Sequence, residues 1–310
     1  MVEGARLRPS GHAHVRPLIY LAGTVLFWGT SFAAIKTAMS SFSPMTVMWL
    51  RMMVASLVFL PFWVRVPKPQ YRAGDWRFLL ASVAFIPCLY YLFEGYAVRL
   101  TTSNQAGVIS ATMPLMVAAG AWVLLRDRLG WQGGLGIGVS MVGIAILSFA
   151  GASQQSAPNP VLGNLLELTA MVAAAGSTLV VKHICQRYDP WFLTGLQAVV
   201  GAIFFAPMAL WSGTGGFASA SPQAWVAVVY LGTCASLGAF GLYNSALKLM
   251  PASKAALAIN LIPAIAMISG WVVLGEALTP LQIGACLLII GAVVFAEVSG
   301  HLRPEEVPVR

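Results

Sequence analysis

Ten apolar stretches, each about twenty residues long, occupy almost the whole chain and restrict what it can fold into. An α-helix of about 20 apolar residues spans the hydrocarbon core of a bilayer. A transmembrane β-barrel would instead alternate apolar and polar residues, whereas the run LQIGACLLIIGAVVF has apolar residues at both registers. The sequence therefore predicts an all-α polytopic membrane protein with ten transmembrane helices, at residues 17–39, 44–65, 76–98, 102–125, 131–150, 161–182, 190–211, 223–246, 251–274 and 280–298.

Basic residues are concentrated in alternate connections between these stretches. The net charge is +8, although only 9% of residues are charged. The connections at 40–43 and 151–160 contain no Lys or Arg, and the third connection contains only Arg99. Positive residues mark cytoplasmic loops, so both termini are predicted to be cytoplasmic. The net positive charge is explained by this topology and does not indicate a nucleic-acid partner. The basic residues on the predicted cytoplasmic side are Arg6, Arg8, Arg16, Arg65, Lys68, Arg72, Arg77, Arg126, Arg128, Arg187, Lys248, Lys254, Arg303 and Arg310.

The residue patterns of an enzyme or a metalloprotein are missing from the sequence. The four cysteines have no CxxC spacing, so neither a disulfide framework nor a zinc site is predicted. The four histidines lie in the tails or at a helix end, and neither HExxH nor GxSxG occurs. We therefore expect no catalytic residue, no metal and no cofactor.

An internal repeat divides the chain into two halves. The segment AAAGSTLVVKHICQRYDP (173–190) matches WGTSFAAIKTAMSSFSP (28–44) without a gap, which aligns Lys36 with Lys182. The segment 97–114 likewise matches 246–263, which aligns Pro114 with Pro263. Because each half contains five helices, the second half must cross the membrane in the opposite sense. Such inverted repeats are typical of secondary transporters, which open a central site alternately to either side.

This repeat predicts the organisation of the chain. Two five-helix repeats at 17–150 and 161–298 follow a cytoplasmic tail at 1–16. An extracytoplasmic linker at 151–160 joins the repeats, and a cytoplasmic tail at 299–310 ends the chain. The first apolar stretch is longer than the core of a signal peptide, so we interpret it as a helix.

Charged residues within the predicted helices are candidates for the transport site, because a charge in the bilayer centre costs about 2.5–3.5 kcal/mol on insertion scales. Arg51, Lys36 and Glu94 all belong to the predicted outer halves of the first three helices and could converge. In one interpretation Arg51 or Lys36 receives a carboxylate of the substrate. In the other, Glu94 pairs with one of the cations and the second one extends to the membrane interface. Glu167 is a further candidate, as a proton-linked carboxylate or as a structural one.

Neutral polar and aromatic residues complete the candidate site. Gln197 aligns with Arg51 and Tyr243 aligns with Glu94 across the repeat, which predicts a substrate with one charged end. Pro114 and Pro263 could free backbone carbonyls for a ligand or act as hinges, and structural kinks are the alternative. The remaining candidates for substrate contact are Trp28, Tyr90, Ser110, Thr112, Asn244 and Asn260.

Several short motifs together resemble those of the drug/metabolite transporter superfamily, specifically its ten-helix EamA-type members. They are WGTSF in the first helix, the spacing of Pro44 to Arg51, the pair LLRDRLG (124–130) and LGEALT (274–279), and the repeat itself. Arg126-Asp127-Arg128 departs from the family pattern, which usually reads like Gly275-Glu276-Ala277. The resemblance implies alternating-access transport of small metabolites, often export of amino acids or related compounds, in the inner membrane of a bacterium.

The leading hypothesis is thus a secondary carrier for a small carboxylate-bearing metabolite in the lipid bilayer. A substrate gradient or a coupled ion such as a proton would drive it, because the sequence encodes no ATP-binding loop. The alternative is a flippase, or a flippase subunit, for a lipid-linked substrate. The sequence leaves a monomer and a homodimer equally open.

Overall fold

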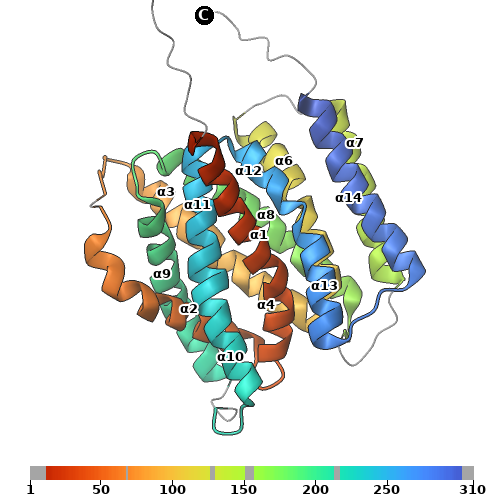
Figure 1. Ribbon diagram of the computed structural model, residues 1–310, viewed down its shortest axis with the longest axis horizontal. Coiled ribbons are helices and arrows are strands. Elements are labelled where there is room, and N and C mark those ends of the chain that lie inside the picture. The colour runs from red at the N-terminus through yellow and green to blue at the C-terminus, as the bar shows by residue number, and fades with distance from the viewer. Residues whose placement is uncertain (1–11, 68, 126–129, 151–156, 213–216, 302–310) are drawn as a thin grey trace, which may run out of the picture.

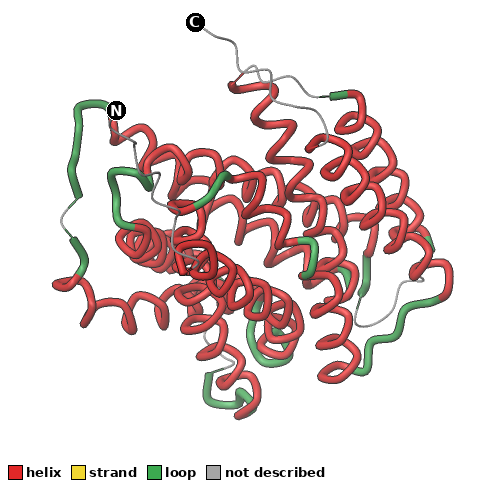
Figure 2. Tube along the Cα trace, turned by 45° about the horizontal axis from the view of Figure 1, so that its top comes forward, coloured by secondary structure: helices red, strands yellow, loops and turns green. Residues whose placement is uncertain are grey.

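The computed structural model describes residues 12–67, 69–125, 130–150, 157–212 and 217–301, and helices make up nearly all of these ranges (Figure 2). Eight helical stretches in the described chain are long and apolar enough to cross a membrane, and Ile262–Leu274 and Pro280–Ala296 are shorter apolar helices. The predicted all-α class with two repeats is confirmed. We call the ten membrane-crossing stretches spans 1 to 10.

The helices of the first repeat form spans 1 to 5. They are α1 (His12–Ala38), α2 (Pro44–Phe59) with η1 (Leu60–Arg65), α3 (Asp75–Val83) with η2 (Ala84–Leu89) and α4 (Tyr90–Leu100), α5 (Ser103–Ile109) with η3 (Ser110–Thr112) and α6 (Met113–Leu125), and α7 (Trp131–Phe149).

The helices of the second repeat form spans 6 to 10. They are α8 (Pro160–Ile184), α9 (Pro190–Trp211), α10 (Pro222–Tyr230) with η4 (Leu231–Ala239) and α11 (Phe240–Leu249), α12 (Ala252–Ile259) with α13 (Ile262–Leu274), and α14 (Pro280–His301). Residues 151–156 of the predicted linker, and most of both predicted tails, lie outside the described residues.

A capping residue followed by proline begins four of the spans. Ser43, Asn159, Asp189 and Ser221 each accept a hydrogen bond from a backbone N–H of the first turn that follows. Proline is suited to the first helical position because its missing N–H has no intrahelical partner there. These pairs place the helix starts within a residue of the predicted ones.

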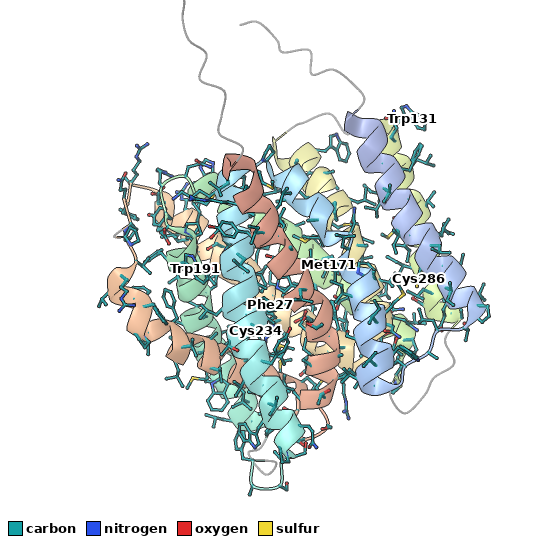
Figure 3. The ribbon with its side chains drawn as sticks, viewed as in Figure 1. Phe27, Trp131, Met171, Trp191, Cys234 and Cys286 are labelled. Carbon is teal, nitrogen blue, oxygen red and sulfur yellow. The ribbon has the colours of Figure 1, made fainter. Side chains whose placement is uncertain are left out.

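The two repeats are interlocked, and equivalent helices run in opposite directions. Helix α1 packs against α10, α11 and α13 of the second repeat, while α8 packs against α4 and α6 of the first. Helix α7 descends from Trp131 at the top of the view and α14 ascends beside it (Figures 1 and 3). The start of α1 and the end of α14 lie at the same end of the molecule, which we call the termini end, and the opposite end is the far end.

Spans 3, 4, 8 and 9 are interrupted near their middle, at equivalent places in the two repeats. Segments η2 and η4 form wider turns in spans 3 and 8. In spans 4 and 9, the helix breaks just before Pro114 and Pro263, which take the second position of α6 and α13. These breaks bring irregular backbone to the centre of the molecule, where it can line a cavity.

Candidate functional site

A cavity lies between the two repeats, and about 40 Å³ of it is open to the centres of water-sized molecules. Residues of spans 1, 3, 4, 6, 8 and 9 form its walls. Helix α8, which is span 6, contributes Met171, Ala174, Ser177, Thr178 and Val181. Most of its residues belong to the halves of these spans nearer the termini end.

Apolar side chains, including several aromatic ones, form most of the cavity wall. The ring of Trp28 lies 4.8 Å from that of Phe240 and 5.1 Å from that of Tyr243, measured between centroids. Phe32, Tyr90, Met113 and Met171 also line the cavity. No described residue of the cavity wall carries a formal charge. The polar residues of the wall are neutral: Ser31, Ser110, Ser177, Thr178 and Asn244.

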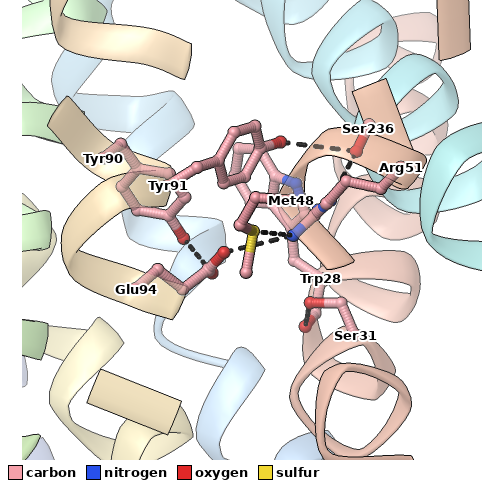
Figure 4. Close-up of polar contacts among 8 residues, drawn as sticks. All are labelled: Trp28, Ser31, Met48, Arg51, Tyr90, Tyr91, Glu94 and Ser236. Atoms are coloured by element: carbon pink, nitrogen blue, oxygen red, sulfur yellow. Dashed lines mark hydrogen bonds and ion pairs between the residues drawn. The ribbon is translucent and has the colours of Figure 1, made fainter. Parts of the chain in front are cut away.

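A chain of polar contacts extends from the cavity wall toward the far end (Figure 4). The hydroxyl of Tyr90 donates to Glu94 Oε1 at 2.6 Å, and Arg51 Nη1 donates to Glu94 Oε2 at 3.2 Å. Arg51 Nε donates to Ser236 Oγ at 2.8 Å, and the guanidinium carbon lies 4.2 Å from the centroid of the Tyr91 ring. Arg51 and Glu94 are each only 2% exposed, so this ion pair is closed off from solvent.

The structure thus brings together two of the three charged candidates. Arg51 and Glu94 pair directly, but Lys36 has electrostatic interactions with Glu276 and Arg99. Glu276 accepts hydrogen bonds from Ser103 N at 3.0 Å, Ser103 Oγ at 2.7 Å and Asn104 N at 3.0 Å. Lys36 therefore lies near a contact between the two repeats at the far end. Asp127, the repeat equivalent of Glu276, is outside the described residues.

Lys182, which aligns with Lys36, is placed at the termini end. Its Nζ donates to Leu247 O at 2.6 Å and to Met250 O at 2.8 Å. These carbonyls end α11, so the lysine caps a helix C-terminus of its own repeat. The two aligned lysines therefore have different partners.

The neutral candidates divide between the cavity and its surroundings. Trp28, Tyr90, Ser110, Tyr243 and Asn244 line the cavity. Thr112 Oγ1 donates to Ile109 O and Gln197 Nε2 donates to Ser82 O, while Asn260 lies in the turn between α12 and α13. None of these last three lines the cavity.

Sequence reasoning missed Ser31, Phe32, Ser177, Thr178 and Phe240 as lining residues. The spacing of Met171, Ala174, Thr178 and Val181 places them on one helical face. The sequence alone does not show that this face points into the cavity, because small and apolar residues occur on all sides of α8.

Comparisons with known proteins agree with this architecture. The EamA-like transporter family matches residues 15–149 and 161–297. The chain is 24% identical over 295 residues to the uncharacterized transporter YetK of Bacillus subtilis, covering 94% of this chain and 89% of that one. It is 25% identical over 281 residues to a probable terminal-alkyne amino-acid exporter of Streptantibioticus cattleyicolor, covering 87% and 90%. A solved crystal structure with 19% identity has the same fold, with a TM-score of 0.62 over 92% of this chain and 97% of the other.

Proposed function

Because the chain belongs to the EamA-like transporter family, we propose that it exports an amino acid or a related carboxylate-bearing metabolite by alternating access. The observation that carries this proposal is the uncharged aromatic cavity between the inverted repeats. A zwitterion with an apolar side chain has no net charge, and its side chain would pack on the aromatic wall. The similarity to a probable amino-acid exporter supports the same class of substrate.

Arg51 is the group proposed to receive the substrate carboxylate when the far end opens. Its guanidinium is bound to Glu94 in this conformation, and Tyr90 separates that ion pair from the cavity. A carboxylate can reach Arg51 only if the ion pair with Glu94 opens. Lys36, Gln197, Thr112 and Asn260 lie outside the cavity and would contact substrate only in another conformation of the carrier.

The orientation proposed from the charge pattern places the termini end in the cytoplasm of a bacterium. Arg65, Arg72, Arg77 and Arg187 lie at this end, whereas Arg99 and Lys36 lie toward the far end. Impermeant thiol reagents test this orientation in cysteine-free protein. The single variant Ser40→Cys should react from outside the cell, and Tyr71→Cys only after the membrane is opened.

Flux in proteoliposomes tests the transport proposal. Radiolabelled amino acids and related carboxylates are loaded on one side, and exchange is followed for the wild type and two variants of α8. Ser177→Leu should abolish exchange because it fills the cavity. Thr169→Leu, an exposed position on the same helix, should exchange like the wild type.

Two results would overturn the proposal. One is exchange by Ser177→Leu at the wild-type rate, which would place the pathway elsewhere. The other is movement of none of these compounds by correctly folded protein. Movement of a lipid-linked substrate in place of them would establish the flippase alternative.

A further inference from the structure

Glu167 is a buried carboxyl group without a hydrogen-bond partner. Its side chain is 0% exposed, and neither Oε1 nor Oε2 meets a donor among the described residues. The other buried carboxylates of the described core are neutralised, because Glu94 pairs with Arg51 and Asp75 pairs with Arg187 at 2.7 Å. The transport proposal given above does not use Glu167.

The position of Glu167 connects it to the cavity. It lies on α8 four residues before Met171, on the helical face that continues through Ala174 and Thr178. Electrostatic interactions join it to Glu94 and Tyr90, and Tyr90 both lines the cavity and donates to Glu94. Glu167 is thus at the far-end limit of the cavity, beside the ion pair of Arg51 and Glu94.

No cation among the described residues reaches Glu167 from the packed helices. Arg99, at the far end of α4, is exposed, and the hydrogen-bond partners of Asn164, which lies three residues before Glu167, are neutral groups. Helix α6 has no titratable side chain, and α11 contributes Tyr243 near Thr178. Asp75 of α3 pairs with Arg187 beyond the opposite end of α8, and Lys248 of α11 also lies toward that end. The neutral neighbours are Thr101, Gln105 and Ser148.

An ionised carboxylate in these surroundings would be strongly unfavourable. Removing it from water costs several kcal/mol unless an opposite charge or hydrogen bonds replace the water. Two neighbouring carboxylates also disfavour each other's charge. Arg51 and Tyr90 both donate to Glu94, so these hydrogen bonds stabilise the ionised form of Glu94. Glu167 has no such donors, so the surrounding side chains favour its neutral, protonated form.

We propose that Glu167 is the proton-binding site of this carrier. It binds one proton from water on one side and releases it to water on the other side as the repeats exchange conformations. No other bond forms or breaks in this step. The coupling to substrate rests on the proposed transport function, whereas the proton occupancy of Glu167 can be tested without any substrate.

Infrared spectroscopy of the full chain in lipid tests the occupancy directly. The carbonyl band of a protonated carboxyl should be present near neutral pH, disappear on titration to high pH, and be absent from Glu167→Gln. Asp189→Asn is the matched control, because it removes a carboxyl that caps α9 while asparagine also caps helices well. A band that Glu167→Gln leaves intact, or that does not respond to pH, would overturn the proposal.

Accumulation in proteoliposomes tests the coupling. At zero membrane potential, a difference of one pH unit coupled to one proton can hold about a tenfold substrate gradient, because one unit corresponds to about 1.4 kcal/mol. We expect about tenfold accumulation by the wild type and by Asp189→Asn, and none by Glu167→Gln. Accumulation is divided by exchange measured without a pH difference, so a loss of overall activity does not count as a loss of coupling.

The two proposals can fail separately in these experiments. If no amino acid or carboxylate moves, the transport proposal fails while the infrared titration still decides whether Glu167 exchanges a proton. If substrate moves and Glu167→Gln keeps the tenfold accumulation, the proton site fails while the transport proposal stands. Glu167→Asp retains a carboxyl group and should restore part of the pH response.

Discussion

At the scale of single residues, Arg51 of span 2 is a buried charged side chain whose charge and hydrogen-bond donors all have partners. Arg51 uses Nη1 for Glu94, Nε for Ser236 and the face of its guanidinium for Tyr91. Such a group remains inside only when its charge and its donors are satisfied together. The ion pair therefore holds spans 2, 3 and 8 together.

Breaking this ion pair from either side should destabilise the protein strongly. Arg51→Gln leaves the Glu94 carboxylate buried without its cation, and Glu94→Gln leaves the guanidinium without its anion. We expect each variant to lose about 3–5 kcal/mol of stability, measured by thermal unfolding in detergent. The double variant Arg51→Gln/Glu94→Gln should lose less than either single one, because no unpaired charge remains. Losses that simply add would show that the two side chains are not energetically coupled.

The sequence was sufficient to single out Arg51 and Glu94 as charges within predicted helices, but not to decide which cation Glu94 binds. A charge in an apolar stretch is visible in the sequence, because its cost is a property of the residue and its depth. Its partner depends on helix rotation and packing, which the uniformly apolar surroundings of Lys36 and Arg51 do not encode. For the same reason the isolation of Glu167 could not be predicted.

At the scale of helices, the predicted boundaries coincide with prolines, and the structure adds the capping residues that precede them. Ser43-Pro44 and Asp189-Pro190 mark helix starts, and Pro114 and Pro263 mark the breaks in spans 4 and 9. The wider turns η2 and η4 were not predicted. Pro87 is a signal for η2, whereas η4 contains no proline and its small residues are compatible with a regular helix.

The glycines of α7 provide a matched pair for testing helix packing. A Cβ at Gly136 would lie 2.7 Å from Ala296 Cβ and 3.1 Å from Ala292 O of α14, whereas a Cβ at Gly134 would meet nothing within 4 Å. Gly136→Ala should therefore destabilise the pair α7–α14 by about 1–3 kcal/mol through overpacking. Gly134→Ala should be neutral or raise stability by up to about 1 kcal/mol. Equal unfolding midpoints in detergent would contradict the close approach of α14 at Gly136.

At the scale of the whole molecule, the two ends of the inverted repeat are not equivalent. At the far end the Glu276 carboxylate of the second repeat binds the first N–H groups of α5 in the first repeat. At the termini end Lys182 binds carbonyls within its own repeat, while Arg187 of the second repeat pairs with Asp75 of the first at 2.7 Å. The cavity residues belong mainly to the termini-end halves of their spans. The repeats contact each other at both ends, through the Glu276 carboxylate at the far end and through the ion pair of Asp75 and Arg187 at the termini end.

Glu276 should act as the closing contact of the far end, because its negative charge meets the positive end of the α5 dipole and two backbone donors at once. Glu276→Ala should weaken this contact by about 1–2 kcal/mol, the usual value of a helix cap, and shift the population toward an open far end. Hydrogen–deuterium exchange in lipid should then quicken in α5, in α13 and around Lys36. Asp189→Ala removes a carboxylate cap within a single repeat, so exchange should quicken only in the first turn of α9. If Glu276→Ala also affects only one helical turn, the carboxylate merely caps α5 and other contacts keep the far end closed.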